Sequence, residues 1–168
     1  MTLDLANLLY QSGRGADAEP LFRSALERAR KQFGPDDPRT AGILAAWGLS
    51  LIQRGQWTEA EPVLRECLAV REKQQPHAWQ SFNTRSMLGG ALLGQKKHDE
   101  AGPLLRSGYK GMVEREDEIP PKGRARLREA VDRLAAFYAA TGKPELAKKY
   151  RAERKKYPEV LPAPLEER

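Results

Sequence analysis

The sequence is poor in the residues that catalytic and metal sites use. Among 168 residues it has one cysteine, Cys67, and two histidines, His77 and His98. A single cysteine excludes an intramolecular disulfide, and these three residues do not have the spacing of a zinc site. We therefore expect a protein that folds without a metal, a cofactor or a disulfide, as suits a reducing cytoplasm.

Long apolar runs are also missing. No stretch approaches the ~18 consecutive apolar residues that a membrane span requires. The first four residues lack the charged start and apolar centre of a secretory signal. Hydrophobic residues nevertheless make up 40% of the chain, which is enough to bury a core. We expect a cytoplasmic protein that does not bind a membrane.

Charge is distributed unevenly along the chain. The net charge is +6, but residues 122–156 hold twelve Lys or Arg against four acidic residues, and the other residues sum to −2. Two interpretations stay open: a terminal repeat with a polar outer face, or a surface for an acidic partner or a nucleic acid. The segment offers only Tyr150 and Tyr157 for base stacking and has no nucleic-acid motif, which argues against a nucleic-acid partner.

The strongest pattern is an internal repeat of 41 to 46 residues. Its markers are a glycine, an alanine and a proline in a short stretch, and an apolar residue eight positions after the alanine. A fixed period predicts stacked units, each too small to bury its own apolar face. The markers are Gly13, Ala18, Pro20 and Leu26 in the first unit, Gly55, Ala60, Pro62 and Leu68 in the second, Ala101, Pro103 and Tyr109 in the third, and Ala147 in the fourth.

The repeated units are predicted to be helical. Apolar residues recur at i, i+3, i+4 and i+7, and no stretch alternates with period two, which excludes β-propeller blades of similar length. We expect Thr58 and Asp99 as N-caps, and an extended or disordered Pro-containing tail over residues 157–168. The expected helices are 2–12, 16–33, 38–54, 58–74, 78–95, 99–117, 123–141 and 144–156, in units of about 1–35, 36–76, 77–119 and 120–156.

Small residues distinguish between the two helical solenoids with repeats near this length. HEAT and armadillo units run to about 40–47 residues, whereas the usual tetratricopeptide unit has about 34. The tetratricopeptide pattern needs a small residue in its first helix, because two antiparallel helices approach closely only where side chains are small. We expect such contacts at four positions, each facing an alanine of the following helix: Ala6, Gly48, Gly89 and Ala135.

With the Gly-Pro-Asp-Asp-Pro turn at residues 34–38 and the Ala-Glu-Pro starts at 18–20 and 60–62, the sequence resembles the 42-residue, kinesin-light-chain-like subclass of tetratricopeptide repeats. The resemblance implies an all-α superhelix of about 3.5 helix pairs. Residues 81–97, 119–121 and 137–144 are also similar to C-terminal repeat regions of bacterial serine/threonine protein kinases. No kinase motif is present, so we expect a non-catalytic arm of a larger signalling protein.

The resemblance also implies a peptide-binding concave side, lined by the first helix of each pair. Amides suit peptide capture because they both donate and accept hydrogen bonds. Gln53 and Asn83 are expected outside the core, and Arg85 is expected to steer acidic residues. Only Asn7 fits the family's carboxylate clamp, which argues against capture of a chaperone tail. The predicted groove residues are Asn7, Gln11, Gln53, Asn83, Arg85 and Ser86.

Two alternatives to a peptide groove stay open. The first is a polar face with no ligand. The second is self-association through Leu3, Leu8 and Leu9, which lie on a first helix without a preceding unit and would pair with another copy. An enzyme is not expected, because no nucleophile, base or metal-ligand constellation is recognisable.

Overall fold

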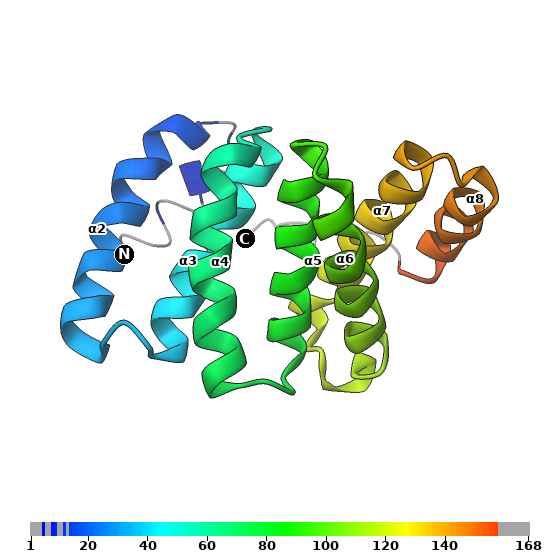
Figure 1. Ribbon diagram of the computed structural model, residues 1–168. Coiled ribbons are helices and arrows are strands. Elements are labelled where there is room, and N and C mark those ends of the chain that lie inside the picture. Colours follow the sequence, from blue (N-terminus) through cyan, green and yellow to red (C-terminus); the bar gives the residue numbers. More distant parts are fainter. Residues whose placement is uncertain (1–4, 6–7, 10–11, 13, 158–168) are drawn as a thin grey trace, which may run out of the picture.

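The structure, a computed structural model, describes residues 5, 8–9, 12 and 14–157 (Figure 1). Within these residues the chain is helical, with no strand, which confirms the all-α fold class. Three short 3-10 helices are η1 (Glu116–Glu118), η2 (Pro121–Gly123) and η3 (Arg154–Lys156). The α-helices are α2 (Gly15–Phe33), α3 (Pro38–Gln53), α4 (Trp57–Gln74), α5 (Trp79–Gly94), α6 (His98–Val113), α7 (Ala125–Ala140) and α8 (Pro144–Glu153).

The turns that end α3, α5 and α7 share one backbone conformation. Gly55 and Gly142 have φ values of 71° and 70°, and Lys96 stands at the equivalent position with a φ of 62°. In the α3–α4 turn the N–H of Gln56 donates to the carbonyl of Leu51 at 2.9 Å. A residue in the left-handed conformation, together with this hydrogen bond, is a common way for a helix to end. The second helix of each hairpin therefore starts at a fixed distance from the first.

The predicted N-caps Thr58 and Asp99 are wrong. The helices α4 and α6 begin one residue earlier than those positions, and the capping residues are Gln56 and Lys97, neither of which forms a side-chain cap bond. The tight turn before each helix fixes its start, so the best capping side chain in the sequence falls inside the first turn. Local capping preference is overridden here by the geometry of the hairpin.

The helix α6 is shorter than predicted. It ends at Val113, whereas the sequence pattern predicted a helix to residue 117. The intervening run contains Glu114, Glu116 and Asp117, and negative charges are unfavourable at the C-terminal end of a helix dipole. The chain instead turns at Glu114 and forms η1.

Close contact between the paired helices is confirmed at two glycines. A Cβ atom added to Gly48 would lie 2.4 Å from Cδ2 of Leu64, and one added to Gly89 would lie 2.7 Å from Cγ of Leu105. In both cases the nearest atoms belong to the leucine four positions after the expected alanine, and that alanine, Ala60 or Ala101, is fully buried in the same core cluster. A leucine side chain seated on a glycine brings two helices together as a knob in a hole.

Further residues lie in the interior or at its edge. Ala135 is 3% exposed and Cys67 is fully buried, while Ala6 lies outside the described residues. Trp47 is partly buried and packs against three of the core clusters. The core is therefore continuous between neighbouring hairpins, as a stacked repeat requires.

Successive hairpins stand side by side in chain order, from α2 to α8 (Figure 1). The first helices form one layer, because α3 contacts α5 and α5 contacts α7. The second helices, α2, α4, α6 and α8, form the other layer. This arrangement is the α-α superhelix that the sequence predicted. We call the layer of first helices the concave side, because first helices line the concave side of such superhelices.

The C-terminal end of the stack has the polar outer face of a terminal repeat. Arg151 and Arg154 are exposed, although the equivalent positions of earlier units are apolar and buried. Tyr157, the first residue of the segment expected to be extended, is 7% exposed and packs against a cluster that includes Met112 and Val131.

Candidate functional site

The predicted groove residues do not all lie on one surface. Asn7 and Gln11 lie outside the described residues, and Gln53 is exposed at the end of α3. Arg85 faces α4, where its Nε donates to Glu72 Oε1 at 3.0 Å and its guanidinium lies 4.9 Å from the Phe82 ring centre. Arg85 is therefore paired within the protein, on the α4 side of α5.

The expectation that Asn83 lies outside the core is wrong, and Ser86 is buried as well. Asn83 is 7% exposed and Ser86 is 0% exposed, because α7 packs along this part of α5. Arg133 of α7 donates to Ser86 Oγ at 3.3 Å. The Oδ1 atom of Asn83 is buried without a hydrogen-bond partner. Buried acceptors of this kind are uncommon in folded proteins.

An open pocket of about 370 Å³ lies on the concave side, which we call the concave pocket. It forms where α3, α5 and α7 meet, with the first residue of α4 at its edge. Three of its residues, Gly90, Asp132 and Ala136, share the concave helix face with the predicted groove residues. Its lining residues are Ile52, Trp57, Gly90, Leu93, Gly94, Asp132, Arg133 and Ala136.

Two glycines of α5 form the floor of the concave pocket. A Cβ atom on Gly94 would lie 2.3 Å from the Trp57 ring, and one on Gly90 would lie 2.8 Å from Cδ of Arg133. The indole and the arginine stem therefore rest directly on the α5 backbone. Both residues line the concave pocket, and we call its apolar interior the slot.

Sequence reasoning missed Arg133 as a site residue. The sequence contained one indication of its role. Arg133 directly follows Asp132, which the helical spacing places on the concave side, so Arg133 lies next to the predicted groove. The structure also places Trp57 at the pocket. Its position there depends on Gly94, a contact between different units that one repeat cannot reveal.

The charge beside the pocket is positive. Arg126 Nη1 donates to Glu129 Oε1 at 2.6 Å, and Arg133 Nη2 donates to Glu129 Oε2 at 3.2 Å. Two guanidinium groups thus share one carboxylate. Burial lowers the pKa of Arg133, and the positive charge of Arg126 acts in the same direction, while Glu129 raises it. An additional carboxylate near Arg133 would stabilise its charge.

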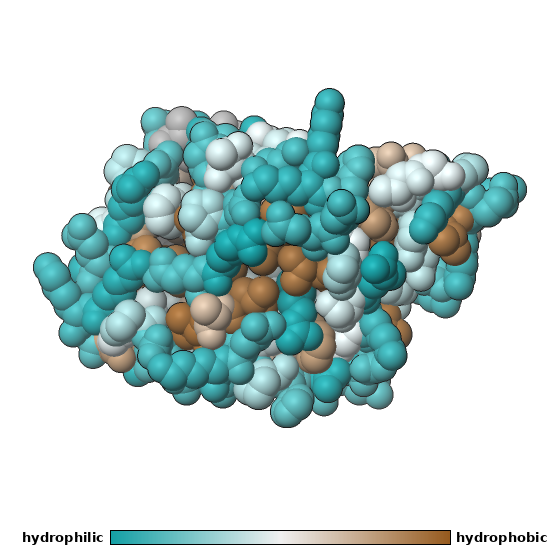
Figure 2. All heavy atoms as spheres, in the orientation of Figure 1, coloured by the Kyte–Doolittle hydropathy of each residue, from teal (hydrophilic) through white to brown (hydrophobic). Residues whose placement is uncertain are grey.

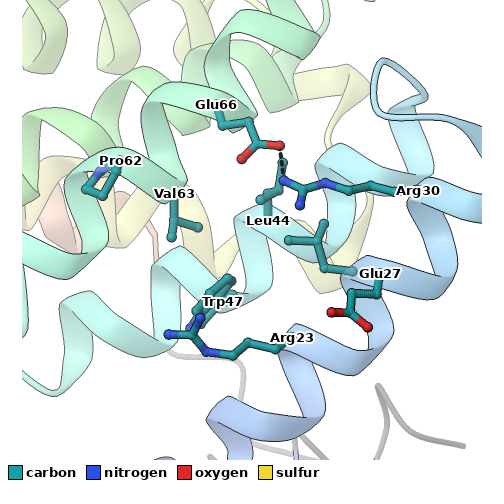
Figure 3. Close-up of a pocket in the computed structure, with 9 residues that line it drawn as sticks. Arg23, Glu27, Arg30, Leu44, Trp47, Pro62, Val63 and Glu66 are labelled. Carbon is teal, nitrogen blue, oxygen red and sulfur yellow. Dashed lines mark hydrogen bonds and ion pairs between the residues drawn. The ribbon is translucent and has the colours of Figure 1, made fainter.

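A second hollow lies on the opposite face, between α2 and α4, and we call it the convex hollow. It has a volume of about 320 Å³. Its apolar floor includes Leu44 and Val63, and Arg30 forms an ion pair with Glu66 across it (Figure 3). Figure 2 shows apolar atoms at the bottom of depressions on this face, surrounded by hydrophilic side chains. The ion pair crosses the convex hollow, whereas the concave pocket is almost wholly apolar.

The potential metal ligands of the described residues do not cluster, and the single cysteine is buried. No group of three or more His, Cys, Asp or Glu among them could hold a metal ion. Burial raises the pKa of the Cys67 thiol, and Cys67 is in contact with Ala41 and Thr84 in the core. A buried thiol of raised pKa is a poor nucleophile. Within the part of the chain described here, no helix is long and apolar enough to span a membrane.

Comparison with known proteins supports the fold. The family model described as Tetratricopeptide repeat matches residues 1–73. A crystal structure of BtubC (BKLC) from P. vanneervenii is 17% identical, with a TM-score of 0.71 over 98% of this chain and 68% of that one. A putative kinesin light chain from Podosopora anserina with nearly identical TPR-like repeats is 20% identical, with a TM-score of 0.71 over 95% and 76%.

A more distant likeness is to MamA from MSR-1, which is 22% identical, with a TM-score of 0.56 over 93% of this chain and 74% of that one. No curated protein matches the chain by sequence. The fold is that of tetratricopeptide solenoids, and the predicted likeness to kinesin-light-chain-like repeats is confirmed at the level of fold. This fold implies a protein–protein interaction or scaffold module.

Proposed function

We propose that the concave side binds an extended peptide or a partner helix, and that the concave pocket holds one apolar side chain of that partner. The observation that carries the proposal is the apolar slot where three first helices meet. Ile52 and Leu93 supply its aliphatic surface and Trp57 an aromatic wall. Aromatic residues around a small pocket are the usual anchors of binding energy at protein interfaces.

Polar residues beside the slot would orient the partner's backbone. Gln53 is exposed and can both donate and accept. Asn83, whose Oδ1 atom is buried, would take part only if a ligand displaced the side chains that cover it. Ser86 would take part only if a ligand displaced its bond from Arg133. Contacts through Asn7 and Gln11, and steering of acidic residues by Arg85, stay predictions.

Filling the pocket tests the proposal. Peptides would be selected from a random 12-residue display library on the intact chain, and their affinities measured by fluorescence anisotropy. Because Ala136 is exposed and lines the pocket, Ala136→Trp should fill the slot without disturbing the core and weaken binding about tenfold or more.

The matched control is Ala139→Trp, an exposed position on the same helix that does not line the pocket. It should leave the affinities unchanged. Equal affinity of the wild-type and Ala136→Trp chains for every selected peptide would contradict the concave pocket as the binding site.

Self-association is the second candidate function. Of the three predicted residues, Leu8 is 61% exposed, Leu9 is partly buried against Ala18 and Phe22, and Leu3 lies outside the described residues. Leu5, which also precedes α2, is 47% exposed. An uncovered apolar surface at the end of a solenoid favours pairing with another copy. Sedimentation across a concentration series, with Leu8→Glu as the dissociating variant, tests this candidate; a monomer at every concentration would dismiss it.

The similarity of residues 81–97, 119–121 and 137–144 to repeat regions of bacterial kinases supports one further proposal about context. The chain would act as the non-catalytic arm of a larger bacterial signalling protein, within the cytoplasm. The neighbouring coding sequence tests this idea, since a kinase domain should precede the repeats in the same reading frame.

A further inference from the structure

The C-terminal segment of the chain has a composition that complements the concave side. Residues 158–168 contain three acidic residues and one arginine. They also contain the apolar residues Val160, Leu161 and Leu165. The preceding unit, residues 122–156, has an excess of eight positive charges. The segment therefore carries apolar side chains suited to an apolar pocket, and negative charges opposite in sign to those of the preceding unit.

The segment starts beside the pocket. Arg154 Nε lies 2.8 Å from Asp132 Oδ1, and Asp132 lines the concave pocket. Three residues later, Tyr157 is buried against α7, which fixes the position from which the segment begins. The eight residues from Tyr157 to Leu165 span up to about 26 Å when extended. This length is close to that of α7, whose 16 residues rise about 24 Å.

Two arginine cations on this side share a carboxylate. Arg126 and Arg133 share the single carboxylate of Glu129, and Asp132 is already paired with Arg154. The concave pocket itself has almost no polar surface apart from these groups. A ligand that places a carboxylate near Arg133 and a leucine in the concave pocket would match both features.

We infer that the concave pocket is a docking site for the chain's own residues 158–168, bound within the same molecule. Leu161 or Leu165 would occupy the slot, and Glu159 or Glu166 would approach Arg133. The inference rests on the proposed function, because it assigns the first occupant of the same pocket. A tethered segment has an effective concentration in the millimolar range, so an external partner must displace it.

The indole of Trp57 reports occupancy directly. In ¹H–¹⁵N spectra of the labelled full chain, its N–H signal is assigned by comparison with Trp57→Phe. The double variant Leu161→Ser/Leu165→Ser should shift this signal, and Ala163→Ser in the same segment should not. A synthetic peptide of residues 158–168 should bind the double variant about tenfold or more tightly than it binds the wild-type chain.

The inference is overturned if the Trp57 signal is the same in the wild-type chain and the double variant. It is also overturned if the shift depends on protein concentration, because the segment would then come from a second copy. Should selected peptides still bind in an Ala136→Trp-sensitive manner, the groove would stand and only the intramolecular occupant would fall. Loss of both effects would remove the groove and the occupant together.

Discussion

The hairpins α3–α4 and α5–α6 use equivalent positions in opposite ways. In α3–α4 the thiol of Cys67 lies 3.3 Å from the carbonyl oxygen of Ala41, so a side chain separates the two helices. In α5–α6 the equivalent residues are Gly108 and Phe82, and a Cβ on Gly108 would lie 2.8 Å from the Phe82 carbonyl oxygen. The backbones of α5 and α6 therefore approach closely where those of α3 and α4 are held apart.

The second-helix residue is smaller in α5–α6 than in α3–α4, but the first-helix residue that faces it is larger. The Phe82 ring lies over Gly111, where an added Cβ would be 2.0 Å from a ring carbon. At the equivalent place in α3–α4, the small Ala41 packs with Val70. Each hairpin thus keeps about the same total volume between its helices but divides it differently. Core packing tolerates such exchanges when the volume is conserved.

The first test of this comparison puts a side chain where α5 and α6 touch. Gly108→Val should destabilise the protein by about 4 kcal/mol, since the new Cβ meets backbone atoms of Phe82 and Ser86 that cannot move aside. Chemical denaturation measures the change. Cys67→Val at the equivalent position of α3–α4 should cost less than about 1.5 kcal/mol. Equal costs at both sites would remove the distinction between the hairpins.

The second test removes the large partner. Phe82→Ala should cost about 3 kcal/mol, because it leaves a cavity above Gly111. Adding Gly111→Val converts the pair into the arrangement of α3–α4 and should restore about half of that loss. A double-mutant cycle in urea measures the coupling. If Gly111→Val worsens the Phe82→Ala variant as much as it worsens the wild type, the two positions do not compensate.

The third test compares the turns of the two hairpins. Lys96 has a φ of 62° in α5–α6, where α3–α4 has Gly55. A left-handed conformation costs a non-glycine residue about 1–2 kcal/mol, and the added freedom of glycine in the unfolded chain cancels part of the gain. Lys96→Gly should therefore raise the free energy of unfolding by about 0.5–1 kcal/mol. Gly55→Ala is the reciprocal control and should lower it; an unchanged melting temperature in both would contradict the shared turn.

The smallest effect is expected at Arg71, which is equivalent to Met112 of α6. Both are buried, and Arg71 donates to the carbonyl of Gln80 at 2.7 Å and to Thr84 Oγ1 at 2.8 Å. Burial lowers the pKa of Arg71 because the charge is desolvated. Arg71→Met should change the free energy of unfolding by less than about 1 kcal/mol, since a well-packed apolar residue often replaces a buried ion at no cost. A loss above about 3 kcal/mol by calorimetry would show that the guanidinium is essential.

Most of the fold was accessible from the sequence, because the repeat and the helical spacing act locally. Gly55 predicts a turn, and Gly48 and Gly89 predict buried helix contacts, because glycine is favoured where φ is positive or where two helices approach closely. The contact partner of those glycines was not accessible. Choosing Leu64 over Ala60 requires the rotation and offset of one helix against the next, which a single hairpin pattern does not specify.

The candidate site was less predictable for the same reason. Ser86 and Asn83 have polar side chains on the expected face, but α7 packs over them, and this depends on contacts between units rather than within one. Trp57 reaches the concave pocket only because Gly94 of the next unit lacks a side chain. The periodicity of one repeat predicts the structure of that repeat, but it does not predict a site that two or three neighbouring repeats form together.

The reciprocal sizes inside each hairpin determine where this protein can be recombined. A chimaera that joined α5 directly to α4 would set Phe82 against Cys67 and Val70, which stand where the native partner helix has Gly108 and Gly111. A crossover at residues 75–78, between α4 and α5, would transfer each matched pair intact. Evolutionary gain or loss of length should therefore proceed by whole hairpins, and engineered arrays built by the same rule should keep their helix spacing.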